Sequence, residues 1–108
     1  MISAGFIMIN SEILNISGKE IKVREMSTKD VDDYIQGRAK TKLVPMVDML
    51  MNSHITSDII LLCTDMTEDT LLESLPSDVE KIIKKIEEIN PFFARLAKSA
   101  VSQPDVNQ

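Results

Sequence analysis

Five branched apolar side chains recur along residues 77–89 with the spacing of a single helix face. They stand at i, i+3, i+4, i+7 and i+10: Val79, Ile82, Ile83, Ile86 and Ile89. This spacing predicts an amphipathic helix whose narrow apolar stripe must be covered by other elements. Ser77 and Glu80 have the spacing of a capping box, so we predict that Ser77 caps this helix.

A second pattern, with a period of two residues, runs from Leu14 to Val23. Apolar residues alternate with polar ones on both sides of a Gly-Lys pair at residues 18–19, which predicts a β-hairpin with a type II′ turn. That turn pairs Ile16 with Ile21 and Leu14 with Val23, and all four side chains then share one face. Because an isolated hairpin is marginal in water, we expect this face to pack on helices.

The rest of the chain carries helix signals. Helix starts are predicted at Ser27, Pro45, Ser57 and Thr67, and at Pro91 with Asn90 as its cap. The run from Ile59 to Cys63 is apolar on all sides and predicts a buried central segment, for which a strand is the alternative. The predicted fold is mainly α, with an N-terminal β-hairpin packed on a bundle of about five short helices. We expect one domain over residues 1–101 and a flexible polar tail over 102–108.

Composition argues against several classes of function. The chain has 108 residues, one cysteine, one histidine and a net charge of −5. A single histidine and a single cysteine argue against a zinc site, a histidine-based triad and a disulfide framework. We expect Cys63 to be a buried free thiol and His54 to be a solvent-facing loop residue. No phosphate-binding glycine loop occurs, and no carboxylate pair is flanked by catalytic partners. Together with the single histidine and cysteine, this predicts no enzyme activity, no cofactor, no metal and no small-molecule substrate.

Charge and hydropathy also bear on partners. The negative net charge argues against nucleic-acid binding, because phosphates must be met by lysine and arginine. No run of 18 apolar residues occurs, which predicts no membrane-spanning helix. The apolar first nine residues lack the basic front of a secretory signal, so we expect none. Between Lys42 and Lys81 there are acidic residues but no lysine or arginine, which predicts helix-terminal acids or a negative patch that helps to select a partner.

The order of these elements resembles the tail assembly chaperones of long-tailed bacteriophages and prophages. The similarity lies in the Leu-Pro at residues 75–76 and the Asn-Pro-Phe-Phe at residues 90–93, with the hairpin as weaker support, and it spans roughly residues 12–100. The resemblance implies a small protein of the host cytoplasm in the short form of this family. Its implied partners are the apolar, helical tape-measure protein and, for some members, tail tube subunits.

Methionines make a candidate surface for such a partner. Seven methionines occur in the chain, and three of them fall within residues 46–51. If this segment is helical, Val47, Leu50 and Met51 share one face, while Met46 and Met49 lie on another. We predict that Met46 and Met49 are partly exposed and bind the partner, because methionine adapts to varied apolar surfaces. The alternative is ordinary filling of the core.

The last predicted helix offers a second candidate. Phe92 and Phe93 stand at its start and point about 100° apart, so one can lie in the core while the other faces outward. Leu96 continues their side of the helix. We predict that Phe92, Phe93 and Leu96 contribute either the second half of the partner groove or a self-association face.

Two other functions compete with an assembly chaperone. A small helical phage protein can regulate transcription or antitermination, for which it would need a basic recognition helix. The best basic cluster, at residues 38–42, is short and lies beside Gly37, and the other basic helix alternates with glutamate. A small enzyme needs a pocket with convergent polar groups, for which the sequence gives no motif. We therefore take the chaperone as the main hypothesis and the regulator as the alternative.

Overall fold

The computed structural model describes residues 10–102, and the side chains of residues 10–99. Two antiparallel strands precede the helices, so the prediction of a mainly α fold with an N-terminal hairpin is confirmed. The described residues contain six helices rather than about five. In chain order the elements are β1 (Ser11–Ile16), β2 (Lys19–Arg24), α1 (Thr28–Ile35), α2 (Pro45–Met51), α3 (Ser57–Cys63), α4 (Glu68–Glu73), α5 (Pro76–Ile89) and α6 (Pro91–Ser102). The apolar N-terminal residues and most of the expected tail lie outside the described part.

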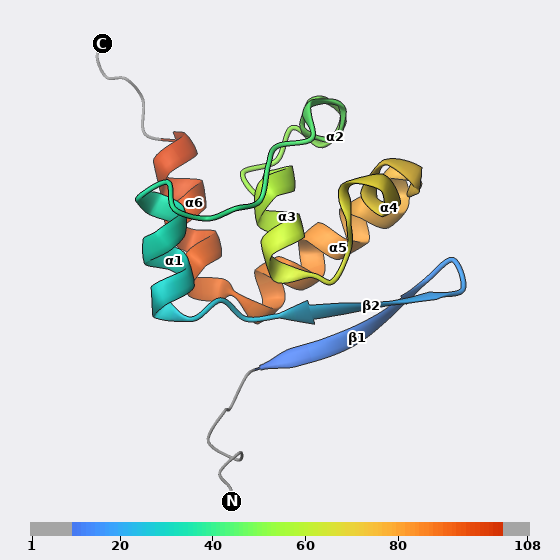
Figure 1. The fold of residues 1–108 in the computed structure, drawn as a ribbon, viewed down its shortest axis with the longest axis horizontal. Coiled ribbons are helices and arrows are strands. Elements are labelled where there is room, and N and C mark those ends of the chain that lie inside the picture. The colour runs from blue at the N-terminus through green and yellow to red at the C-terminus, as the bar shows by residue number, and fades with distance from the viewer. Residues whose placement is uncertain (1–9, 103–108) are drawn as a thin grey trace, which may run out of the picture.

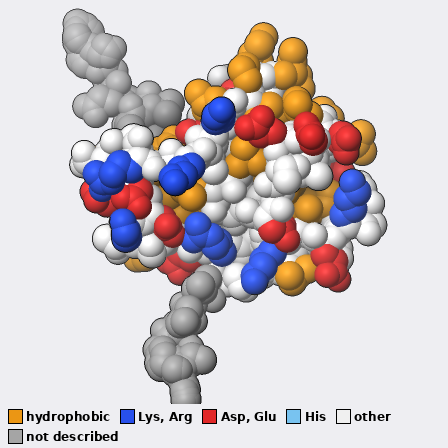
Figure 2. All heavy atoms as spheres, in the orientation of Figure 1, with side chains coloured by type: hydrophobic (Ala, Val, Ile, Leu, Met, Phe, Trp, Pro, Cys, Tyr) orange, Lys and Arg blue, Asp and Glu red, His pale blue; other side chains and the backbone are white. Residues whose placement is uncertain are grey.

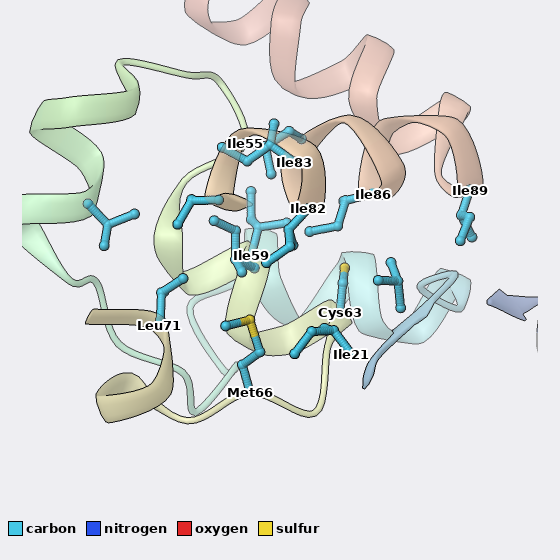
Figure 3. Packing of buried hydrophobic residues seen from close by; sticks show 14 of the residues in the cluster. Ile21, Ile55, Ile59, Cys63, Met66, Leu71, Ile82, Ile83, Ile86 and Ile89 are labelled. Carbon is cyan, nitrogen blue, oxygen red and sulfur yellow. The ribbon is translucent and has the colours of Figure 1, made fainter. Parts of the chain in front are cut away.

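Helix α5 is the central element of the fold. It contacts both strands of the hairpin as well as α2, α3 and α6, and the hairpin lies along one side of the helices (Figure 1). All five residues of the predicted stripe are buried, from Val79 to Ile89. Figure 3 shows isoleucines of α5 turned toward Ile59 and Cys63 of α3. Helix α5 therefore joins the hairpin to the other helices.

The start of α5 differs from the prediction. The helix begins at Pro76 with Leu75 as its N-cap, and no side chain caps it, so the predicted Ser77 capping box is wrong. Proline fits the first position of a helix, and it forces the residue before it into extended backbone. Leu75 has that backbone, with φ −70° and ψ 144°. Proline at residue 76 therefore sets the helix start one residue before Ser77.

The hairpin has a different register from the predicted one. Ile16 pairs with Lys19 and Leu14 pairs with Ile21, so the two-residue loop is Ser17–Gly18. Both loop residues have positive φ, 51° and 80°, as a type I′ turn requires. The predicted pairs and turn type are therefore wrong. The predicted shared face is confirmed, because Ile16 and Ile21 are buried with Val23, and Leu14 packs against the same core.

A buried asparagine ties the hairpin to the junction of α5 and α6. The Met26 backbone N–H donates to Asn90 Oδ1 at 2.7 Å. Asn90 Nδ2 donates to the backbone oxygens of Arg24 and Ile86, both at 3.1 Å. The Asn90 backbone oxygen accepts from Ala94, as expected at a helix start. The predicted capping role therefore holds for the backbone, while the side chain of Asn90 bonds to the end of the hairpin.

The remaining helices begin close to their predicted positions. Ser27 caps α1 in a capping box with Asp30, and Thr67 caps α4. Pro45 is the first residue of α2. The apolar run after residue 58 is helical, which settles the choice between helix and strand. Helix α3 begins at Ser57 as predicted, with Thr56 as its N-cap. Ser57 itself is fully buried in the first turn of α3.

Candidate protein-binding surface

Helix α2 and the segment just before it carry four large apolar side chains that face away from the core. The exposed fractions are 57% for Leu43, 54% for Met46, 74% for Met49 and 59% for Leu50. We call these four residues the α2 patch. Figure 2 shows apolar side chains gathered along the edge of the molecule where Figure 1 places α2, with acidic side chains beside them. Four such side chains on a seven-residue helix and its preceding residues form a contiguous apolar area rather than scattered surface residues.

A buried hydrogen-bond network fixes which side of α2 faces outward. The carboxylate of Asp48 accepts from the backbone N–H of Ser57 at 2.7 Å and from Ser57 Oγ at 2.8 Å. The Val44 backbone N–H donates to Ser57 Oγ at 2.6 Å. Val47 fills the core on the same side of the helix. Because α2 is attached to α3 on this side, Met46 and Met49 are directed to solvent.

The predicted exposure of Met46 and Met49 agrees with the structure, but the predicted position of Leu50 does not. Leu50 was expected to share the buried face with Val47 and Met51, yet it is more than half exposed. Adjacent residues of an α-helix point about 100° apart, so the apolar side chains of α2 are spread widely around its axis. Helices α3 and α5 cover only part of that spread. Leu50 therefore extends the α2 patch.

The two phenylalanines of α6 have opposite environments. Phe93 is 6% exposed and its ring meets that of Tyr34 edge to face, with centroids 5.8 Å apart. Phe92 is 72% exposed, and the guanidinium of Arg95 lies 5.2 Å from its ring centroid. Phe93 therefore belongs to the core, which corrects its inclusion among the partner-binding residues. Phe92 and Leu96 remain at the surface.

The five predicted site residues do not form one surface. Met46 and Met49 lie on α2, while Phe92 and Leu96 lie on the first turns of α6, and Figure 1 places these two regions well apart. Ile35, at the end of α1, is a further exposed apolar residue. The larger and more continuous of the two regions is the α2 patch, so we take it as the candidate site.

Sequence reasoning missed the two residues that position α2. Asp48 was interpreted only as one acid among many, and Ser57 as the start of a helix. The available signal was their spacing, because an aspartate within a short helix and a serine nine residues later can meet when the connection is tight. That signal is too common in sequences to single out this pair. The structure identifies it through burial, since Ser57 is 0% exposed.

Cys63 is buried as predicted, and burial raises the pKa of its thiol to about 12. Only the thiolate is a good nucleophile, so the folded protein holds this group in an unreactive form at neutral pH. We expect a disulfide reagent at pH 8 to modify Cys63 at least about a thousandfold more slowly than in the chain unfolded in urea, because reaction requires opening of the core. Absorbance of the released thiolate measures both rates. A native rate close to that of the unfolded chain would contradict this expectation.

His54 is less exposed than predicted. Its Nε2 lies 2.8 Å from a carboxylate oxygen of Glu87 on α5, and its side chain is 22% exposed. It is therefore a half-buried link between the α2–α3 connection and α5 rather than a solvent-facing residue. Among the described residues, no group of three or more histidine, cysteine, aspartate or glutamate side chains is arranged to hold a metal ion.

Comparison with known proteins does not assign the chain to a family. No family model, no curated protein and no solved structure matches it. None of the helices within residues 10–102 combines the length and the apolar character needed to cross a bilayer. Function must therefore be argued from the surface itself.

Proposed function

We propose that this protein is a non-enzymatic tail assembly chaperone that binds an apolar helical segment of a tape-measure protein. The observation that carries the proposal is the α2 patch, in which Met46 and Met49 are exposed beside Leu43 and Leu50. A chaperone of a long helical protein needs an apolar surface that adapts to many different helix turns. Methionine suits this need, because its unbranched side chain repacks at low cost.

A groove next to the α2 patch supports the same proposal. It has a volume of about 350 Å³ and lies between α2 and α5. Leu50, Met51, Pro76 and Ile83 contribute apolar lining, while Glu80, Lys84 and Glu87 also line it. Leu50 belongs to both the patch and the groove. An apolar helix laid across Met46 and Met49 would therefore have a recess beside it for a further side chain, as helix-in-groove recognition requires.

The alternative, a transcription or antitermination regulator, has less support. Arg38 is the first residue of the basic cluster, and its guanidinium is held by Asp32 at 2.7 Å and Asp33 at 2.9 Å. These ion pairs neutralise part of the cluster's charge. The segment lies in the connection between α1 and α2 and is not a helix, so it does not form the recognition helix that a regulator would need.

Co-expression with a tape-measure protein from the same phage or prophage tests the proposal. We expect the tape-measure protein to stay soluble and to co-purify. The double variant Met46→Gln/Met49→Gln should raise the Kd about thirtyfold, because an apolar anchor at an interface contributes about 1 kcal/mol or more. Isothermal titration with a soluble tape-measure fragment measures this change.

The matched control removes the same number of exposed apolar side chains elsewhere. Ile13 on β1 and Ile35 on α1 are exposed to a similar degree as Met46. The variant Ile13→Thr/Ile35→Gln should bind like the parent protein. Equal binding by the methionine variant, with its fold intact by circular dichroism, would refute the proposed role of the α2 patch. A tape-measure protein that neither stays soluble nor co-purifies would refute the proposed function.

A further inference from the structure

We propose that a second groove, between the hairpin turn, α4 and α5, binds a lysine- or arginine-bearing segment of another polypeptide. We call it the acidic groove. It has a volume of about 370 Å³ and combines an apolar floor with a charged rim. The acidic groove shares no residue with the α2 patch, so the two surfaces can be tested separately.

The floor of the acidic groove is apolar. Ile16 and Ile21 of the hairpin, Met66 before α4 and Ile82 of α5 all line it. Each of these residues is also part of the buried core. The floor is therefore fixed by the packing of the fold, and a ligand would meet a preformed surface.

The rim of the groove is strongly acidic. Glu20, Asp65, Glu73 and Asp78 line it, against one cation, Lys19. Asp78 accepts from Ser17 Oγ at 2.6 Å, and Asp65 accepts from the Lys22 backbone N–H at 3.1 Å. Asp78 also lies 4.0 Å from Lys81 Nζ on α5. Two of the four carboxylates thus have partners within the fold.

Glu20 and Glu73 differ from those two carboxylates. Both residues are exposed, and within residues 10–99 neither forms an ion pair or a side-chain hydrogen bond. The sequence from Leu43 to Glu80 contains no lysine or arginine, so the α4 side of the groove contributes only negative charge. Lys19 is the one cation that lines the groove, so the four carboxylates outnumber it and the groove keeps a net negative charge that attracts cations from outside.

A lysine or arginine side chain matches both parts of this surface. Its aliphatic stem can lie on the apolar floor while its charged end meets the acidic rim. Leu75 lines the groove and is 59% exposed. This leucine extends the apolar surface of the groove toward solvent. A segment with a basic residue next to a large apolar one fits this arrangement better than a small cation does.

A second copy of this chain is a less suitable occupant. Lys40 and Lys42 precede the exposed Leu43 and have the right chemistry. They lie on the connection between α1 and α2, away from the hairpin turn (Figure 1). When identical chains bind through two different surfaces, each added chain leaves one surface free, so the assembly ends only if it closes into a ring. The proposed occupant is therefore a segment of a different protein.

Nuclear magnetic resonance titration tests the acidic groove with a defined probe. The probe is the peptide acetyl-Ala-Lys-Leu-Arg-Ala-amide, added to the ¹⁵N-labelled full chain at low salt. We expect saturable shifts of the backbone amides of Glu20, Asp65, Glu73 and Leu75. The matched peptide acetyl-Ala-Glu-Leu-Glu-Ala-amide should cause none. Raising the salt concentration to 0.5 M should weaken binding at least fivefold, because exposed charges are then screened.

Charge variants separate a specific site from general attraction. Glu20→Gln/Glu73→Gln should weaken peptide binding at least fivefold. Glu68→Gln/Asp69→Asn makes the same change in net charge on exposed residues of α4 that do not line the groove, and it should bind like the parent. Equal loss in both variants, no saturable shift at 5 mM peptide, or shifts confined to α2 would each overturn the proposal. So would sedimentation that shows self-association of the parent chain and its loss in Glu20→Gln/Glu73→Gln, since a second copy would then fill the groove.

Discussion

Replacing Asn90 by alanine should lower the free energy of unfolding by about 3 kcal/mol. The substitution leaves the buried N–H of Met26 without its acceptor and removes a donor from the backbone oxygen of Arg24. A buried polar group that loses its partner costs about 1–3 kcal/mol. In a domain of this size, a loss of 3 kcal/mol corresponds to a fall in Tm of about 15 °C. Urea and thermal unfolding followed by circular dichroism measure both quantities.

The same chemical change at an exposed site provides the control. Asn15 lies on β1 and is exposed, so Asn15→Ala should alter the free energy of unfolding by less than about 0.5 kcal/mol. If Asn90→Ala were as mild as this control, the bonds between Asn90 and the hairpin would not stabilise the fold. The difference in the free energy of unfolding between the two variants gives the contribution of the Asn90 hydrogen bonds, separate from the general effect of losing an amide side chain.

Replacing Asp48 by alanine should destabilise the protein by about 2–3 kcal/mol and also weaken partner binding. The carboxylate of Asp48 accepts two hydrogen bonds from Ser57, which is fully buried. Bonds to a charged group contribute about 1.5–3 kcal/mol each, and part of this loss is offset because Asp48 is itself only half-buried. Without this attachment α2 keeps the packing of Val47 and Met51 and the Val44–Ser57 hydrogen bond but is held less firmly, so its amides should exchange with solvent faster than those of α5.

A double-mutant cycle with Ser57→Ala tests the connection directly. We expect a coupling free energy above about 1 kcal/mol, since residues that share hydrogen bonds do not act additively. Asp69→Ala, an exposed aspartate of α4, should cost a few tenths of a kcal/mol at most and bind normally. Additive effects of Asp48→Ala and Ser57→Ala would mean that the pair does not hold α2 in place.

Most helices and the hairpin could be predicted from the sequence because their signals are local. The stripe from Val79 to Ile89, the Ser27 cap and the prolines at residues 45 and 91 each act within one or two turns of chain. The hairpin register could not be predicted this way. Ser17 adopts a positive φ and its hydroxyl bonds to Asp78, which is 61 residues away in sequence. That contact exists only after α5 has packed against the hairpin.

The candidate site was predictable only in part, for a related reason. Helical spacing separated Met46 and Met49 from Val47 correctly. It could not show that α3 and α5 would cover only a narrow side of α2 and leave Leu50 exposed. Nor could it decide which of Phe92 and Phe93 would meet Tyr34, since that depends on how α6 lies against α1. The acidic groove lies between segments distant in sequence, so its floor has no local signal at all.

The central position of α5 has a consequence for biosynthesis. The hairpin is synthesised before α1–α6, and most of its contacts with the helices are made with α5. Ile21 and Val23 therefore stay largely exposed in the nascent chain until residues 76–89 have been synthesised. Changes in translation speed before residue 76 should have little effect on the yield of native protein, whereas a premature stop before residue 76 should yield an unfolded fragment.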